Sequence, residues 1–464
     1  MHLPLILSVV LEAAASFKIL GYNPIFGNGH ANYIGKIADT LSEIGHEVVL
    51  LTPIVNSRLA NHTSEHARVI FFEQTQFAKE YEQQHDVELS GLWTASTANA
   101  FATLKPLEKM ARVMAKQCEV MLSTPGFLEK LRAERFDAAY SGENDLCGHA
   151  TLSATSDKMT LFERMRNLAR HLGVVHNYYG TYAEVFDKQF RAMLLNVPPI
   201  TELLSKSSFF FVNCEPLYAF PSLSVEKVVE IGGITAVQSN PLDEHWSTIL
   251  QRRNRTVLIS FGSEVQSYQM PEAYKQSIKA VVRSFPDITF IWKYEKPEDG
   301  IADHHNNLIA VPWIPQNDML NDGRLAAFVT HGGAGSITES VLAGVPLVVI
   351  PIYGDHFRNA QQAQRAGSAL FVSKEDLATP YPLKTALGRV LGEPRIPEVH
   401  RCMLRTHFSF RRKAKETAQM IHHRPFSAKE KLIRHFEFMA RFGPFPNLDH
   451  HSLNLSFIEF YLLD

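Results

Sequence analysis

The sequence predicts an α/β protein built from two doubly wound domains that face each other across a cleft. Residues 18–52 read as strand, loop, helix and strand, and such a βαβ unit implies a parallel sheet. Residues 256–350 repeat short apolar runs separated by helical patterns. A chain of 464 residues is also too long for one hydrophobic core, so two domains are expected.

The first half begins with a βαβ unit whose elements can be placed along the chain. Ala31–Ile44 carries aliphatic residues at helical spacing on one face, and Gly45 supplies a left-handed stop after it. The predicted elements are strands over Lys18–Tyr22, Glu47–Thr52 and Phe136–Tyr140, a turn-rich loop over Asn23–His30, and the helix over Ala31–Ile44.

The second half repeats this order more clearly. Its predicted elements are a strand and glycine turn over Thr256–Gly262, a helix over Tyr274–Ser284, strands over Ile288–Lys293, Leu308–Val311 and Leu325–Thr330, a helix over Ser336–Leu342, and a strand over Pro346–Ile350. Turn-forming and polar residues between Pro221 and Asn254 place the domain boundary there. Ligands of such sheets bind beyond the carboxyl ends of the strands.

The charge balance argues against a polyanionic partner. The chain has 46 basic and 48 acidic residues, a formal net charge of −2, whereas a nucleic-acid-binding protein shows a basic excess or a basic stripe. The four cysteines are scattered and form no C-x-x-C pair. They therefore give no support to zinc or redox-motif chemistry.

The first residues are typical of a secretory signal peptide. An apolar run over Leu3–Leu11 is followed by small residues up to Ser16. The alternative is a buried first strand, which the lack of Lys or Arg before the run favours. N-x-S/T sequons at Asn61, Asn254 and Asn454 are compatible with a glycosylated lumenal protein. No segment reaches eighteen apolar residues, so we expect no membrane span in this chain.

The segment Thr330–Glu339 carries the densest chemical signal. An apolar strand runs into a glycine-rich turn that opens directly into a helix. Glycines let a ligand approach the backbone, and the first N–H groups of a helix are unpaired at the positive end of its dipole. Ser336 adds a hydroxyl, and Glu339 is placed to accept hydrogen bonds from a ribose diol. The segment predicts a diphosphate site, with a tight strand-to-helix turn and no ligand as the alternative.

Around this segment the chain resembles the UDP-glycosyltransferases, most closely the animal UDP-glucuronosyltransferase branch with a nematode-like character. The matching stretches are Phe211–Pro216, Val228–Ile234, Ser260–Ser263, Val311–Gln316, His331–Gly333 with Ser336 and Glu339, Gly344–Pro346, Pro351, Asp355–Ala360 and Phe442–Asn447. The resemblance covers nearly the whole chain. It implies a GT-B fold whose second domain binds the UDP-sugar and whose first domain binds the acceptor.

The resemblance also implies a domain layout. The signal peptide would span residues 1–16, the acceptor-binding domain 17–235 and the UDP-sugar-binding domain 236–425. A C-terminal helical segment, 426–464, would pack back onto the first domain. Relatives continue after this segment into a membrane-spanning helix, and no such anchor is expected in this chain.

Carried over position by position, the resemblance assigns the donor site to residues of the second domain. Trp313 would stack on uracil, Gln316 and Glu339 would bind the uridine, Ser263, His331, Gly333 and Ser336 would surround the diphosphate, and Asp355 and His356 would contact the sugar hydroxyls, with Asn359 nearby. The family usually has Gln at the position of His356. The choice among glucuronic acid, glucose and galactose therefore stays open.

The candidate general base is His30, which follows the first predicted strand. A histidine with a near-neutral pKa suits removal of a proton from the acceptor, and His30 falls on the catalytic histidine of the family. A capping or surface histidine is the alternative. The family has Thr-Asp or Thr-Glu where this chain has Ser141–Gly142. Glu143 or Asp145 are candidates to replace that carboxylate, and Asp145 is preferred.

The first domain departs from the family after Cys147. Relatives continue there with a helix, a strand and an acceptor-lining loop before the stretch that this chain already reaches at Ser156–Arg164. A βαβ crossover needs about a dozen residues, so we expect one crossover of the first sheet to be missing.

The predicted activity is inverting transfer of a glucuronosyl or glucosyl group from a UDP-sugar to a small lipophilic acceptor. UDP-glucuronate or UDP-glucose is the expected co-substrate, with no further cofactor and no metal ion. The alternative is a catalytically impaired UDP-sugar-binding protein that acts by association with intact relatives. A UDP-sugar epimerase is weaker, because such enzymes lack the Trp313–Gln316 and Asp355–His356 pattern. The resemblance further implies detoxification in the endoplasmic reticulum lumen, membrane association, and a homo- or hetero-oligomer.

Overall fold

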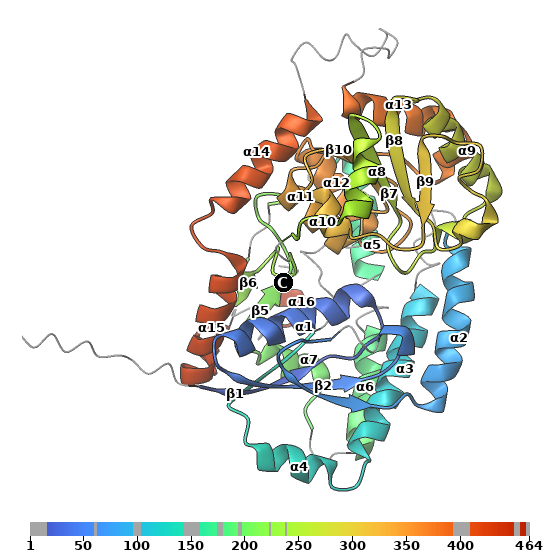
Figure 1. Ribbon diagram of the computed structural model, residues 1–464. Helices are drawn as coiled ribbons and strands as arrows, with labels where there is room; N and C mark the ends of the chain where they lie inside the picture. The colour runs from blue at the N-terminus through green and yellow to red at the C-terminus, as the bar shows by residue number, and fades with distance from the viewer. Residues whose placement is uncertain are drawn as a thin grey trace, which may run out of the picture.

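A computed structural model describes most of the chain and confirms the predicted α/β class. Two parallel sheets with flanking helices form two bodies, one above the other in the view of Figure 1. None of the helices in the described part of the chain is long and apolar enough to cross a bilayer. The described residues are 16–59, 63–95, 104–142, 158–173, 180–193, 197–221, 224–236, 239–392, 409–449 and 455–460.

The N-terminal sheet, over the described residues, has four parallel strands in the order β3–β2–β1–β4. Its elements are β1 (Lys18–Tyr22), α1 (Asn28–Glu43), β2 (Glu47–Pro53), β3 (Arg68–Phe72), α2 (Gln76–Gly91), α3 (Leu104–Leu122), α4 (Phe127–Glu134) and β4 (Ala138–Ser141). After it come α5 (Leu161–Gly173), α6 (Gly180–Met193), α7 (Ile200–Ser205), and a two-stranded parallel sheet of β5 (Phe210–Val212) and β6 (Val228–Glu230). Residues 143–157, where the crossover is expected to be missing, lie outside the described residues.

The C-terminal sheet, in the part of the chain that the structure describes, has six strands in the order β12–β11–β10–β7–β8–β9, and all its pairs are parallel. Its strands are β7 (Arg255–Ser260), β8 (Ile288–Lys293), β9 (Leu308–Val311), β10 (Leu325–Thr330), β11 (Leu347–Val349) and β12 (Ala369–Phe371). The helices are α8 (Glu244–Gln251), α9 (Glu272–Arg283), α10 (Gln316–Leu320), α11 (Ala334–Ala343), α12 (His356–Arg365), α13 (Pro380–Leu391), α14 (Phe410–His422), α15 (Ala428–Phe442) and α16 (Phe457–Phe460). The chain builds outward from β7 to β9 and then restarts at β10, so the order reverses between β7 and β10. Ligands of doubly wound sheets bind at this point, beyond the carboxyl ends of the strands.

Both faces of the C-terminal sheet are covered, which explains why its strands read as unbroken apolar runs. Every residue of β8 and β10 is buried. Phe290 and Trp292 face one hydrophobic cluster, whereas Ile291 and Phe328 face a second cluster on the opposite side. A rigid, doubly covered sheet of this kind gives the loops at its carboxyl edge fixed starting points.

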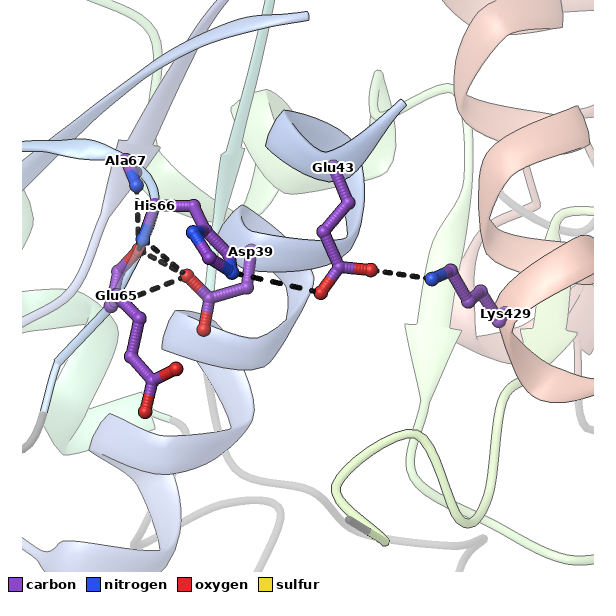
Figure 2. Close-up of polar contacts among 7 residues, drawn as sticks. Asp39, Glu43, Glu65, His66, Ala67 and Lys429 are labelled. Atoms are coloured by element: carbon purple, nitrogen blue, oxygen red, sulfur yellow. Dashed lines mark hydrogen bonds and ion pairs between the residues drawn. The ribbon is translucent and has the colours of Figure 1, made fainter. Parts of the chain in front are cut away.

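Helix α15 returns from the C-terminal domain and packs against the N-terminal one. Phe436 on α15 is fully buried in the core that α1, β1 and β2 form. At the surface, Lys429 pairs with Glu43 of α1, and the other carboxylate oxygen of Glu43 lies 3.9 Å from His66 Nε2 (Figure 2). One turn earlier, Asp39 Oδ1 accepts the backbone N–H of His66 at 3.0 Å. Helix α1 is therefore held between the loop before β3 and helix α15.

Three helices begin earlier than the sequence predicted, and one of them is α9, which starts at Glu272 rather than at Tyr274. Helix α1 starts at Asn28, so His30 lies in its first turn rather than in the preceding loop. Asn28 and Gly29 have low helix propensity, which hides this turn from a sequence pattern. Helix α11 starts at Ala334, two residues before the predicted start at Ser336.

Candidate active site

The loop between β10 and α11 forms the floor of the site. Gly332 has φ +91°, and a Cβ there would come 2.7 Å from the Val349 side chain. Gly333 is the N-cap of α11 and makes no side-chain capping bond. The first backbone bond of the helix runs from Ile337 N–H to Gly333 O. The amides of the three residues before Ile337 therefore face outward at the positive end of the helix dipole, as an anion site requires.

The ring of His331 lies between two glycine-containing loops. A Cβ on Gly262 would come 2.7 Å from the His331 ring, and one on Gly333 would come 2.5 Å from His331 Nε2. Only glycine at both positions lets the imidazole pack this closely. Burial lowers the pKa of His331 well below its ordinary value. The ring is therefore neutral at pH 7, so it can both donate and accept hydrogen bonds.

His356 is a buried residue that packs against His331. Its side chain is only 4% exposed, and its ring packs edge-on against His331 and Tyr353, with centroid distances of 4.6 and 4.5 Å. Its Nδ1 accepts the backbone N–H of Tyr353 at 3.4 Å. Burial lowers the pKa of His356 to about 3. The sequence predicted that His356 contacts the sugar, and in the structure its ring lies beside the ring of His331.

Asp355 and Asn359 tie the start of α12 to the glycine loop. Asn359 Nδ2 donates to Asp355 Oδ2 at 2.7 Å and to Gly332 O at 2.9 Å. Burial raises the pKa of Asp355, opposed by the Asn359 hydrogen bond and by the nearby histidines His331 and His30. A desolvated carboxylate facing two imidazoles can accept hydrogen bonds from hydroxyl groups or stabilise a cation.

Gln316, Ser336 and Glu339 form a second connected group. Gln316 Nε2 donates to Glu339 Oε2 at 2.7 Å and to Ser336 Oγ at 3.1 Å. Burial raises the pKa of Glu339, and the Gln316 bond partly opposes this. The structure thus brings together the three residues that the sequence placed around a ribose and a phosphate.

Trp313 offers an open aromatic face beside this group. It follows β9, and 62% of its surface is exposed. The ammonium of Lys293 lies 5.7 Å from the centre of the indole ring and donates to Gly262 O at 2.9 Å. Ser263 follows Gly262 in the turn after β7 and is exposed. An exposed indole at the edge of a polar loop cluster suits stacking on a nucleobase.

His30 approaches the same loops from the N-terminal domain. Its ring packs against Phe26 at a centroid distance of 4.6 Å. Burial lowers the pKa of His30, whereas the negative charges of Asp355 and Glu264 raise it. These two carboxylates belong to the C-terminal domain, so the candidate base and the candidate donor loops lie within electrostatic reach across the cleft.

The carboxylates predicted to orient His30, Glu143 and Asp145, lie outside the described residues. Gly142, the residue just before Glu143, has little room for a side chain. A Cβ on Gly142 would come 2.3 Å from the Ile34 side chain. The side chain that the family carries there does not fit without a shift of Ile34. Within the described residues, the acids that act on His30 are instead Asp355 and Glu264.

Three residues of the site were not predicted from the sequence: Glu264, Lys293 and Tyr353. Glu264 lies in the turn after β7, and Lys293 is the last residue of β8. The rule that ligands bind at the carboxyl edge of a parallel sheet could have identified both. Tyr353 has no such signal, because its role depends on its contact with His356.

A small hollow adjoins the site where the N-terminal domain meets α11 and α12. Its volume is about 50 Å³, and Asp355 and Asn359 lie on its wall together with Tyr218 and Gln362. This is room for a few water molecules beside Asp355 and Asn359.

Comparison with known proteins shows the family. The family described as "UDP-glucoronosyl and UDP-glucosyl transferase" matches residues 26–151 and 146–407. A Caenorhabditis elegans protein named as the UDP-glucuronosyltransferase ugt-48 is 24% identical over 98% of this chain and 92% of its own. Human 2-hydroxyacylsphingosine 1-beta-galactosyltransferase is 24% identical over 97% of this chain and 85% of its own.

The fold is shared with solved glycosyltransferases. The structure of the spinosyn rhamnosyltransferase SpnG with thymidine diphosphate matches with a TM-score of 0.57 and 17% identity, over 90% of this chain and 100% of that one. This likeness confirms the predicted GT-B arrangement, including the C-terminal helix that returns to the first domain. With a donor-type loop cluster in its second domain and a family match across most of its length, the chain belongs to the UDP-glucuronosyl and UDP-glucosyl transferase family.

Proposed function

We propose that this glycosyltransferase transfers a glucuronosyl or glucosyl group from a UDP-sugar to a small lipophilic acceptor, with inversion at the anomeric carbon and with His30 as the general base. The observation that carries the proposal is the approach of His30, on α1, to Asp355 at the start of α12. The proposed base therefore lies within electrostatic reach of the proposed sugar site.

The donor is held by the C-terminal domain. The amides at the start of α11 and the ring of His331 surround the diphosphate, and Trp313 covers the uracil ring. Gln316 holds Glu339 in place to accept hydrogen bonds from the ribose hydroxyls. The solved rhamnosyltransferase SpnG, which shares the fold, was crystallised with a nucleoside diphosphate.

The reaction is a single displacement. The acceptor oxygen forms a bond to the anomeric carbon while the bond from that carbon to the diphosphate breaks, and UDP leaves with the electron pair. The acceptor proton passes to His30, whose lowered pKa keeps the imidazole neutral and ready to accept it at pH 7. Asp355 stabilises the resulting imidazolium. The helix dipole of α11 stabilises the negative charge that develops on UDP.

We propose that the enzyme works in the lumen of the endoplasmic reticulum. The apolar run at residues 3–11 and the sequons support this location. A lipophilic acceptor fits a lumenal enzyme of detoxification, and association with a second chain is part of the same proposal.

The test is a product assay with the purified full chain. UDP-glucuronate and UDP-glucose are each incubated with a panel of phenols, and proton NMR of the product reads its anomeric configuration. A β-linked product from an α-linked donor supports the proposal. Saturable UDP binding without product from any pair favours the alternative of a catalytically impaired UDP-sugar-binding protein.

A further inference from the structure

The residues that follow helix α2 enter the hydrophobic core of the C-terminal domain. Trp93 lies two residues after α2, and its side chain is 0% exposed. It belongs to the hydrophobic cluster around β7 and β8 rather than to the N-terminal core. Figure 1 shows α2 standing at the edge of the molecule, with its C-terminal end against the C-terminal domain.

Two contacts of Trp93 hold the two ends of one turn. Its indole Nε1–H donates to Gln266 O at 3.2 Å, and its ring packs edge-on against Phe261 at a centroid distance of 5.2 Å. The turn between these residues contains Gly262, Ser263 and Glu264. It is the turn after β7 that contributes to the active site.

A buried lysine anchors the same segment from the other side. Lys374, in the loop after β12, is 2% exposed and donates to the carbonyl of Leu92. Burial lowers the pKa of Lys374, and Glu375 opposes this. The backbone next to Trp93 is therefore fixed to the C-terminal domain by a hydrogen bond from a buried side chain.

The first half of α2 supports His30. Ala78 and Tyr81 form a buried cluster with Val55 and Val113, and Phe26 packs against this cluster. The Phe26 ring in turn contacts the ring of His30. Helix α2 has 16 residues and so spans about 24 Å at 1.5 Å per residue. Helix α2 thus contacts Phe26, which packs against His30, at one end. At its other end it leads into Trp93, which contacts the turn after β7.

We propose that Trp93 is a positioning residue that fixes the turn of residues 262–265 and thereby sets the separation between His30 and the donor. This inference rests on the proposed function. Trp93 itself touches neither the proposed substrates nor the reacting atoms. It acts through Phe261 and Gln266, and Lys374 is its second anchor.

The experiment compares full-length Trp93→Phe and Lys374→Met with a matched control, Trp246→Phe. Trp246 lies on α8 and packs against the opposite face of the same sheet. Trp93→Phe keeps an aromatic ring beside Phe261 but removes the donor to Gln266. Each protein is measured for its melting temperature, its kcat and KM with the UDP-sugar, and amide hydrogen exchange at residues 261–266.

We expect Trp93→Phe and Lys374→Met to speed exchange at residues 261–266 and to lower kcat/KM by about 10- to 100-fold, because small misplacements at a reacting centre are costly. Trp246→Phe should leave both unchanged. A purely structural role would lower the melting temperature and leave kcat and KM at wild-type values. That result, or unchanged exchange at 261–266 in Trp93→Phe and in Trp93→Ala, overturns the inference. If the wild-type chain makes no product, the proposed function fails, and the exchange measurement alone decides the inference.

Discussion

The two domains contribute to the active site in different ways. The C-terminal domain supplies a group of loops whose side chains are bonded to one another, as in the Gln316–Glu339 and Asn359–Asp355 pairs. The N-terminal domain supplies His30, whose ring is positioned by packing against Phe26. Under the proposed function, donor binding is shared among many contacts, whereas proton transfer depends on His30 alone. Mutations should therefore separate binding from catalysis according to the domain they affect.

The largest effect is expected for His30→Ala. Loss of a general base lowers the rate by about 10²- to 10⁴-fold, while UDP, held by the other domain, should bind with unchanged affinity. Initial rates and calorimetry on the same preparation check this. His66→Ala, at an exposed histidine of the same domain, is the control and should keep full activity. Equal rates for His30→Ala and the wild type would remove His30 from the mechanism.

Trp313→Ala should mainly weaken donor binding. Stacking of a base on an aromatic ring contributes about 1–3 kcal/mol, so the Kd for UDP should rise about 5- to 150-fold. The exposed position of Trp313 predicts a change in the free energy of unfolding within about 0.5 kcal/mol. Tyr381→Ala, another exposed aromatic residue of this domain, should leave the Kd unchanged. An unaltered Kd in Trp313→Ala would contradict the stacking role.

The pH dependence of kcat/KM should reveal the electrostatic interaction between Asp355 of the C-terminal domain and His30 of the N-terminal domain. His30 acts as a base in its neutral form, so kcat/KM should rise with pH through the pKa of His30, which burial places below its ordinary value. Asp355 opposes this lowering. In Asp355→Asn the rising limb should therefore move to still lower pH, by a few tenths of a unit up to about one unit. Glu244→Gln, at an exposed position of α8, serves as the control, and a limb that stays in place in Asp355→Asn would show that the two groups do not interact.

The smallest effect is expected where α15 meets α1. Both partners of the Lys429–Glu43 pair are partly exposed, and such surface pairs contribute about 0–1 kcal/mol. A double-mutant cycle with Lys429→Ala and Glu43→Ala, followed by denaturant unfolding, measures this contribution. A coupling energy well above about 1 kcal/mol would mean that the pair, rather than the buried Phe436, controls the docking of α15.

The sequence predicted the C-terminal domain more completely than the N-terminal one, for physical reasons. Strands buried on both faces appear in the sequence as continuous apolar runs. The strand–glycine–helix pattern at Thr330–Glu339 locates the loop between β10 and α11 directly. The start of α1 was missed because Asn28 and Gly29 carry no helical signal. The burial of Trp93 could not be predicted, because its partners Phe261 and Gln266 are far away in sequence and meet it only in the folded chain. For the same reason, the approach of Glu264 to His30 depends on how the two domains pack.

Titration of the wild-type chain with UDP in a calorimeter tests the central claim most directly. The account predicts saturable binding at one site per chain, with the nucleotide held by the loop after β10 and by the indole after β9. The absence of saturable heat for a folded preparation would contradict the assignment of the C-terminal loops to a UDP-sugar.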